Sequence, residues 1–169
     1  MTSFNPSTDL LDLKGKVALV SGGSSGIGLE TVRFLAQVGA LVYMGARNES
    51  RATGAIAELE HDGLQPGNGE IRYFDLDLNN PRDVKVAGEA FLEREKRLDL
   101  LIHNAGIVST NTKPGRDGVV ENVTVNYIGP FLLTQILLPL LKKTAREPSS
   151  DVRVIYVSSA CHVNYCMLL

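Results

Sequence analysis

The sequence predicts an α/β protein with one doubly wound parallel sheet, and two observations lead to this fold class. Apolar runs of strand length alternate along the chain with longer stretches of helical periodicity, which is typical of strand–helix–strand units. The chain also has the size and composition of a single domain, with 169 residues, 44% hydrophobic and 21% charged. Parallel strands joined through helices require crossovers that cover both faces of the sheet.

Five strands and four helices are expected in alternation. The strands are Val17–Val20, Ala40–Gly45, Ile71–Phe74, Asp99–His103 and Val152–Val157, and the helices are Ser25–Val38, Ser50–Glu60, Pro81–Arg97 and Gly118–Lys143. Gly39 follows the first helix as a C-terminal cap. Asn80 and Pro81 start the third helix as a capping residue followed by proline.

The most informative segment is the turn that joins the first strand to the first helix, because it contains three spaced glycines. Glycine lets the backbone approach a ligand closely, and the N–H groups and dipole of a helix start favour an anion. In an alternating strand–helix chain that anion is usually the pyrophosphate of a dinucleotide, and a tight turn with a purely structural role is the alternative interpretation. The expected cofactor contacts are Ser21, Gly22, Ser24, Ser25, Gly26, Ile27 and Gly28.

Arg47 lies just past the second strand, about 20 residues beyond the glycine turn, where a dinucleotide fold meets the adenosine ribose. A carboxylate at this point would bind the 2′-hydroxyl, but no acidic residue occurs before Glu49. Arginine instead makes paired charge-assisted hydrogen bonds to a 2′-phosphate. The sequence therefore favours NADP over NAD, and a solvated surface arginine is the alternative interpretation.

Polar groups also follow the third and fourth strands. Asp77, with Leu78, is placed to accept a hydrogen bond from an adenine amino group; Asp75 is a competing candidate, and helix capping is the alternative. The run Asn104-Ala105-Gly106 follows the fourth strand. Its small residues let the backbone pass close to a cofactor ribose, and Asn104 can tie neighbouring strands together.

Together these motifs resemble the short-chain dehydrogenase/reductase family in its single-domain form, from about Leu13 to Ser159. The turn at 21–28 is similar to the family's glycine motif, with Ser21 in place of the commoner threonine. His103-Asn104-Ala105-Gly106 resembles its Asn-Asn-Ala-Gly, with His103 as a departure. Asn126, in Val125–Phe131, matches the asparagine of the family's fourth helix. Ser159 matches the catalytic serine delivered by the fifth strand.

The resemblance implies a Rossmann-like NAD(P)-binding fold with strand order 3-2-1-4-5. It also implies an NADP-dependent oxidoreductase that interconverts a carbonyl and an alcohol on a small-molecule substrate. In that enzyme Ser159 would hold the substrate oxygen, and Asn126 would support an active-site water and a lysine. A nucleotide-sugar enzyme of the related extended type is disfavoured, because its glycines are more closely spaced.

The family's acid–base pair, a tyrosine followed four residues later by a lysine that lowers its pKa, is missing from the sequence. Four residues beyond Tyr43, Tyr73, Tyr127, Tyr156 and Tyr165 stand Arg47, Asp77, Phe131, Ala160 and Leu169. We therefore expect a form truncated after the fifth strand, from an incomplete gene model or transcript or as a natural short form. The alternative function is a non-catalytic NADP-binding protein.

The expected organisation is an N-terminal extension at 1–12, an incomplete dinucleotide-binding domain at 13–159 and an irregular tail at 160–169. Truncation would leave the fifth strand as an exposed apolar edge, which predicts poor solubility or a homo-oligomer.

The remaining features exclude several classes of partner. The net charge of −2 gives no reason to expect a nucleic acid. Met1–Leu13 lacks the pattern of a signal peptide, and Tyr127–Leu141 is too interrupted and short for the ~20 residues of a membrane helix. Cys161 and Cys166, even with His162, fit no familiar zinc spacing, so no metal is expected. A cytoplasmic location follows as the expectation.

Overall fold

A computed structural model describes residues 9, 11–62, 64, 68–110, 113–115 and 118–159, and within them five parallel strands form one sheet of order β3-β2-β1-β4-β5. The strands are β1 Val17–Ser21, β2 Leu41–Ala46, β3 Glu70–Asp75, β4 Leu100–His103 and β5 Arg153–Tyr156. The helical segments are α2 Gly26–Gln37, α3 Glu49–Asp62, α4 Pro81–Arg94, α5 Glu121–Val123, the π-helix η1 Thr124–Ile128, and α6 Gly129–Thr144. The predicted fold class and strand order are confirmed.

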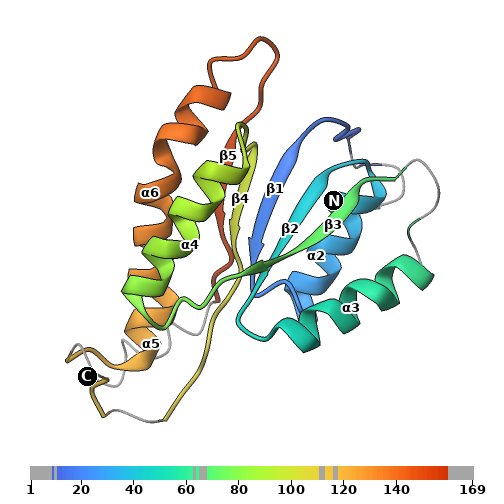
Figure 1. The fold of residues 1–169 in the computed structure, drawn as a ribbon. Coiled ribbons are helices and arrows are strands. Elements are labelled where there is room, and N and C mark those ends of the chain that lie inside the picture. The colour runs from blue at the N-terminus through green and yellow to red at the C-terminus, as the bar shows by residue number, and fades with distance from the viewer. Residues whose placement is uncertain are drawn as a thin grey trace.

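Helices cover the sheet on both faces (Figure 1). Because successive strand residues point to opposite faces, β1 contributes Leu19 to one core and Val20 to the other. Leu19 packs in a cluster with Phe91 of α4 and Leu133 of α6, while Val20 packs in a cluster with Val32 of α2. The two-sided burial explains why the central strands are apolar runs rather than alternating patterns.

The local signals at the helix ends are confirmed at two places and wrong at a third. Asn80 caps α4, because its Oδ1 accepts a hydrogen bond from the Arg82 N–H at 3.0 Å. The Gly39 N–H donates to the Ala36 carbonyl where α2 ends. The predicted start of the last helix at Gly118 is incorrect. The Gly118 N–H donates to the Gly115 carbonyl in a turn, so the helical stretch begins at Glu121.

The stretch Glu121–Thr144 is 24 residues long, with a window of mean hydropathy 1.4, so by length and composition alone it could cross a membrane. The segment Tyr127–Leu141 was expected to be too short to span a membrane, but the helical stretch that contains it is longer. Its inner side packs in the core through Leu133, Leu137 and Leu140, which are 0%, 0% and 6% exposed. A helix at the core of a soluble protein has the same character.

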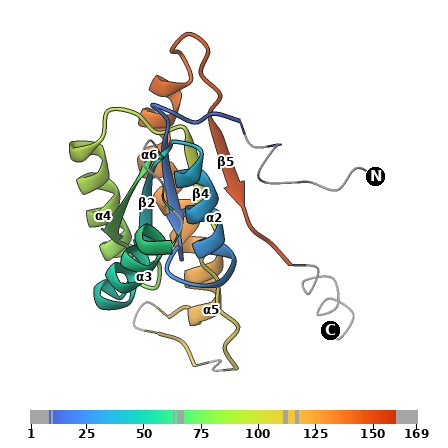
Figure 2. The ribbon, with the colours of Figure 1, turned by 90° about the vertical axis from the view of Figure 1, so that its right-hand side faces the viewer.

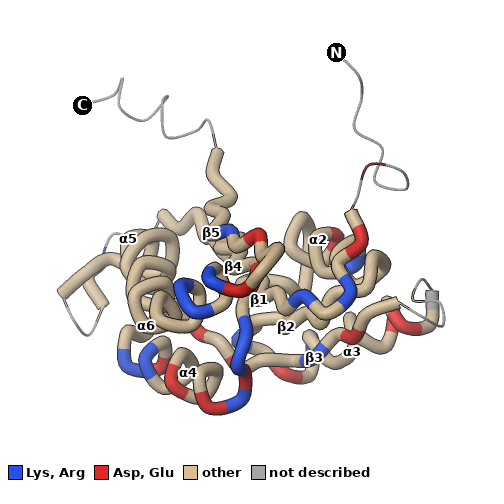
Figure 3. Tube along the Cα trace, turned by 90° about the horizontal axis from the view of Figure 1, so that it is seen from above, with Lys and Arg blue, Asp and Glu red and all other residues tan. Residues whose placement is uncertain are grey.

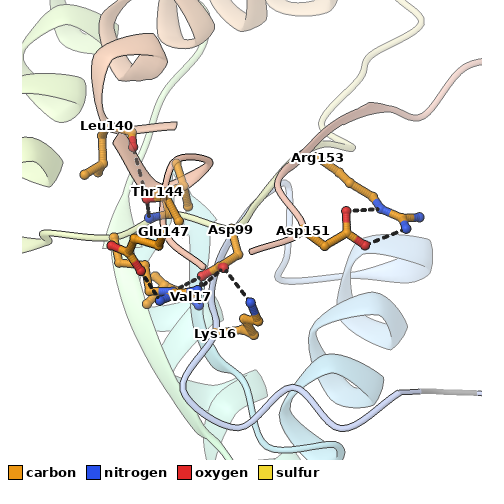
Figure 4. Close-up of polar contacts among 10 residues, drawn as sticks. Lys16, Val17, Asp99, Leu140, Thr144, Glu147, Asp151 and Arg153 are labelled. Atoms are coloured by element: carbon orange, nitrogen blue, oxygen red, sulfur yellow. Dashed lines mark hydrogen bonds and ion pairs between the residues drawn. The ribbon is translucent and has the colours of Figure 1, made fainter. Parts of the chain in front are cut away.

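Charged residues of both signs are mixed along α4 rather than separated (Figure 3). A cluster of ion pairs lies at the amino ends of the strands (Figure 4). There the buried Asp99 accepts from both Arg97 Nε and Arg97 Nη2, at 2.6 and 2.7 Å, and from the Val17 N–H at 3.0 Å, with Lys16 Nζ at 3.2 Å. Arg97 also reaches Glu147, beyond the end of α6. These contacts join the starts of β1 and β4 to the segment that leads into β5.

Candidate functional site

The candidate site lies at the carboxyl edge of the sheet, where the ends of parallel strands meet. A cavity of about 460 Å³ opens there, between the glycine turn, the start of α3 and the segments that follow β3 and β4. Its lining includes most of the predicted cofactor contacts: Ser21, Gly22, Ser24, Ser25, Ile27, Arg47, Asp77, Leu78, Asn104, Ala105 and Gly106. The topology therefore brings together residues from four separate parts of the sequence.

The glycine turn leaves the start of α2 available to a ligand. Gly22 and Gly26 have φ of 66° and 55°, a left-handed conformation that glycine adopts without strain. The N-cap residue Ser25 makes no side-chain capping bond, and the first turn of α2 has no acidic residue. No side chain of the first turn of α2 therefore competes with a bound anion for the N–H groups and the positive end of the helix dipole. Gly26 and Gly28 shape this turn and do not line the cavity.

Asn104 ties the end of β4 to the glycine turn, as predicted. Its Nδ2 donates to the carbonyls of Ser21 and Gly22, both at 3.2 Å. In the other direction, Ser21 Oγ accepts from the backbone N–H groups of Asn104 and Ala105, at 3.2 and 3.1 Å. The turn is therefore held by side chains from both strands, which fixes the shape of the cavity floor.

Arg47 lines the cavity together with Arg51, which was not among the predicted cofactor contacts. A signal was available in the sequence, because Arg51 lies in the first turn of the helix expected from Ser50, a few residues after Arg47. Asn48 lies between them, and its Oδ1 caps α3 by accepting from the Arg51 N–H at 2.8 Å. The two arginines give this part of the cavity a positive charge that suits a phosphate.

Asp77, not Asp75, belongs to the cavity. Asp77 lines it, whereas Asp75 lines only a neighbouring cavity of about 590 Å³ on the α4 side. Asp77 Oδ1 accepts from the Asn79 N–H at 2.9 Å, which holds the carboxylate at the end of β3. The Asp75 carboxylate accepts instead from the Tyr73 hydroxyl at 3.3 Å.

The two residues assigned to catalysis lie outside the cavity lining. Asn126 sits in the π-helix, a feature often found at functional sites. Its amide is occupied in both directions by Ile107: Oδ1 accepts from the Ile107 N–H and Nδ2 donates to the Ile107 carbonyl, each at 2.9 Å. Asn126 therefore fixes the segment after Gly106. Ser159 is exposed and follows β5 at the same edge of the sheet. Tyr165 lies outside the described residues.

His103 occupies a buried position beside the site. Its Nε2 lies 2.8 Å from Thr134 Oγ1, and Thr134 Oγ1 lies 3.0 Å from the Tyr156 hydroxyl. The rings of His103 and Tyr156 pack at 4.5 Å between centroids. Burial lowers the pKa of His103 to about 4, so the ring is neutral at physiological pH.

The parallel sheet, the glycine turn and the cavity at the strand ends define a dinucleotide-binding α/β protein. The family model for short chain dehydrogenases matches residues 16–167, so the chain belongs to this family. A short-chain dehydrogenase/reductase of Armillaria gallica is 44% identical over 153 residues, which cover 90% of this chain and 47% of that protein. Human retinol dehydrogenase 11 is 36% identical over 162 residues, 96% of this chain and 48% of that protein. The chain thus spans slightly less than half the length of these relatives.

Solved structures show the same fold. The Pseudomonas aeruginosa RhlG/NADP active-site complex superposes with a TM-score of 0.72 at 29% identity, covering 88% of this chain and 56% of that chain. An alcohol dehydrogenase from the archaeon Thermococcus sibiricus, complexed with 5-hydroxy-NADP, has a TM-score of 0.68 at 27% identity. It covers 85% of this chain and 58% of that chain. The chain is therefore related to oxidoreductases with a nicotinamide cofactor.

Proposed function

We propose that this chain binds NADP at the carboxyl edge of its sheet and forms the cofactor half of an oxidoreductase that interconverts a carbonyl and an alcohol on a small molecule. The observation that favours NADP is the pair Arg47 and Arg51 at the rim of the cavity. A 2′-phosphate carries the negative charge that two guanidinium groups bind well. Two structural neighbours, one in complex with NADP and the other with 5-hydroxy-NADP, support the same choice.

The residues of the cavity fit the parts of a dinucleotide in order. The start of α2 would hold the pyrophosphate, because its N–H groups and dipole favour an anion. Arg47 and Arg51 would hold the 2′-phosphate, and Asp77 would accept a hydrogen bond from the adenine amino group. Asn104-Ala105-Gly106 would lie against the second ribose, where small residues permit close approach.

The chemical step divides between the cofactor and the chain. Bound NADP(H) would supply or accept the hydride, and the balancing proton would be exchanged with water, because the sequence lacks the tyrosine and lysine that the family uses for this transfer. Ser159 would donate a hydrogen bond to the substrate oxygen and orient it. Asn126 positions the segment after Gly106 through its two bonds to Ile107, and so keeps one wall of the site in place. The polypeptide is proposed to work in the cytoplasm without a nucleic acid or metal.

Nucleotide titration tests the cofactor assignment. In Arg47→Ala, the Kd for NADPH should rise at least about tenfold, because a charge-assisted bond to the phosphate is lost. The Kd for NADH should change less than about twofold. Lys85→Ala is the matched control, since it removes one exposed positive charge on α4, outside the cavity, and should change neither constant. Equal losses for both nucleotides would overturn the NADP proposal.

Turnover is tested separately from binding. NADPH oxidation by the 169-residue chain is measured against a panel of ketones and aldehydes, with Ser159→Ala as the inactive control. Activity that depends on Ser159 supports the oxidoreductase reaction in this form. Tight NADPH binding without any turnover would instead identify this form as the non-catalytic NADP-binding protein, because the sequence lacks a tyrosine followed four residues later by a lysine.

A further inference from the structure

The cavity of about 590 Å³ beside the nucleotide cavity is a groove between β3 and α4, at the edge of the sheet opposite β5, and we call it the β3–α4 groove. Within the described residues β3 pairs only with β2, so its outer edge meets no further strand. Val86, Ala87 and Ala90 form the apolar part of the α4 wall, and Val86 is 66% exposed. Figure 2 shows β5 on the opposite side of the molecule from α4, so the groove lies away from the strand after which the chain continues.

The hydrogen bonds to β2 show which backbone groups of β3 face outward. The Glu70 N–H donates to the Ala40 carbonyl and the Leu76 N–H donates to the Ala46 carbonyl, both at 3.2 Å. Alternate residues of a strand direct their N–H and C=O groups to opposite sides, and the residues between these two follow the same alternation. The outward N–H and C=O groups are those of Ile71, Tyr73 and Asp75. Backbone groups of this kind can pair with an added strand.

The end of the groove near the carboxyl end of β3 is negatively charged. Three carboxylates line it, those of Asp75, Asp77 and Asp83, together with the single guanidinium group of Arg47. The hydrogen bonds that these carboxylates accept come from uncharged donors. A cationic side chain at this end would therefore meet more opposite than like charges.

The other end of the groove is positively charged. α4 runs antiparallel to the strands, so its last turn, which contains Arg94, lies beside the amino-terminal half of β3. Two contacts with Tyr43 agree with this placement: the Arg94 guanidinium lies 5.9 Å from the centre of the Tyr43 ring, and Arg72 Nη1 donates to the Tyr43 hydroxyl at 3.3 Å. Because Arg94 also lines the groove, an acidic side chain is favoured at this end.

We propose that the β3–α4 groove binds an extended segment of a partner protein, which joins the sheet as a further strand antiparallel to β3. Antiparallel pairs are slightly more stable per residue than parallel pairs. The segment carries a basic residue toward its amino end, an apolar residue at its centre and an acidic residue toward its carboxyl end. Antiparallel pairing then puts the basic residue beside the three carboxylates and the acidic residue beside Arg94.

The alternation of side chains gives the spacing of these three residues. Phe74 and Leu76 belong to the core cluster that contains Phe91 of α4, so their side chains face α4, and Arg72 lies on the same face of the strand. Directly opposed residues of an antiparallel pair have their side chains on one face of the sheet. The residues of the segment opposite Leu76, Phe74 and Arg72 therefore point toward α4. The basic, apolar and acidic residues occupy these alternate positions in that order.

Two peptides of identical composition test the proposal. The first, Lys-Thr-Ile-Thr-Glu-Thr, has the proposed order, and the second, Glu-Thr-Ile-Thr-Lys-Thr, exchanges the two charges. Both are acetylated, amidated and labelled with a fluorophore, and fluorescence anisotropy is measured without nucleotide, so the result is independent of the NADP proposal. The first should bind at least about tenfold more tightly, because the exchange replaces two ion pairs with two like-charge contacts. Equal affinities, or no binding of the first peptide, overturn the proposal.

Filling the groove tests the place of binding. Ala90→Trp puts a large side chain into the groove from an exposed position of α4, and Ala57→Trp is the matched control at an exposed position of α3 outside the groove lining. Ala90→Trp should weaken the first peptide at least about tenfold, and Ala57→Trp should leave its Kd unchanged. Arg94→Glu should weaken the first peptide and strengthen the second, because it reverses the charge at one end. A first peptide that binds Ala90→Trp as tightly as the unaltered chain overturns the assignment to this groove.

Amide hydrogen exchange followed by NMR distinguishes an added strand from other modes of docking. The first peptide should slow exchange at the outward N–H groups of Ile71, Tyr73 and Asp75. Exchange at Arg72 and Phe74 should change little, because their N–H groups already face β2. Peptide binding without this alternating protection would overturn the strand addition.

Discussion

At the residue scale, the glycines of the β1–α2 turn are required for different reasons. A Cβ atom at Gly28 would overlap the Gly22 carbonyl oxygen and Asn104 Nδ2, so this position is closed by packing. A Cβ atom at Gly26 would meet nothing within 4 Å, and its φ of 55° is the constraint there. The sequence pattern predicts the turn, but it does not distinguish a glycine needed for space from one needed for backbone conformation.

The hydrogen bonds around His103 determine which ring nitrogen carries the proton. Thr134 Oγ1 donates its single proton to the Pro130 carbonyl at 2.8 Å, so it accepts from both of its other neighbours. His103 Nε2 is therefore the donor in its bond to Thr134, and Tyr156 donates its hydroxyl proton to the same oxygen. Nδ1 of His103 is left as a buried acceptor without a partner among the described residues.

This histidine predicts a specific pH dependence of stability. The native ring has a pKa of about 4, lowered from 6.5 by burial, so between these values the unfolded chain binds more protons than the folded one. The contribution of His103 to folding stability is thus fully present above pH 6.5. The free energy of unfolding should fall by up to about 3 kcal/mol as the pH drops to 4. Urea unfolding across this range measures the slope. His103→Gln should flatten it, and an equally steep variant would contradict the assignment.

At the element scale, the ion cluster around Asp99 holds the amino ends of the strands together. Asp99 is 1% exposed, and its carboxylate is shared by Lys16 and Arg97 and by the start of β1. The bonds from Arg97 hold the pKa of Asp99 below its usual range despite the opposing effect of burial. The Asp151–Arg153 pair nearby is similar in chemistry, but both of its side chains are exposed (Figure 4).

These two aspartates give a matched pair of variants. Asp99→Asn should lower the free energy of unfolding by about 3 kcal/mol, because it leaves two cations without their buried counter-charge. Asp151→Asn removes the same charge at an exposed pair and should leave the urea midpoint close to that of the unaltered chain. Urea denaturation at pH 7 measures both. Similar losses in the two variants would show that burial of Asp99 is not the source of its effect.

The elements also show what the sequence could and could not predict. The central strands β1, β2 and β4 were predicted because buried parallel strands are apolar runs. The outer strands β3 and β5 are partly exposed, and they were predicted from shorter apolar runs at Ile71–Phe74 and Val152–Val157. The π-helix at Thr124–Ile128 was not predicted, because its i→i+5 bond, from the Gly129 N–H to the Thr124 carbonyl, has no sequence signature. Packing against Leu78 also requires a glycine where the π-helix ends, because a Cβ atom at Gly129 would come within 2.6 Å of the Leu78 carbonyl oxygen.

At the scale of the whole molecule, the carboxyl ends and the amino ends of the strands have separate roles. The residues proposed to bind the nucleotide lie at the carboxyl ends of the strands, and the cluster around Asp99 lies at their amino ends. The sequence predicted most of the first group, because Arg47, Asp77 and Asn104 each follow a predicted strand. It did not predict the second, because Lys16, Asp99 and Glu147 are far apart along the chain and meet only through the topology.

This separation predicts that nucleotide binding and the Asp99 cluster act independently on stability. A ligand that binds only the folded chain stabilises it by about 2.7 kcal/mol at 100 times its Kd. If the edges are uncoupled, saturating NADPH should add this same increment to the unaltered chain and to Asp99→Asn, although the variant starts from a lower stability. Arg47→Ala, at the nucleotide site, should keep its starting stability and lose about half of the increment at the same NADPH concentration, because a tenfold higher Kd removes about 1.4 kcal/mol. Urea unfolding of the three proteins with and without NADPH measures the three starting stabilities and the three increments. A smaller increment in Asp99→Asn would show that the amino-edge cluster shapes the nucleotide site through the strands that connect them.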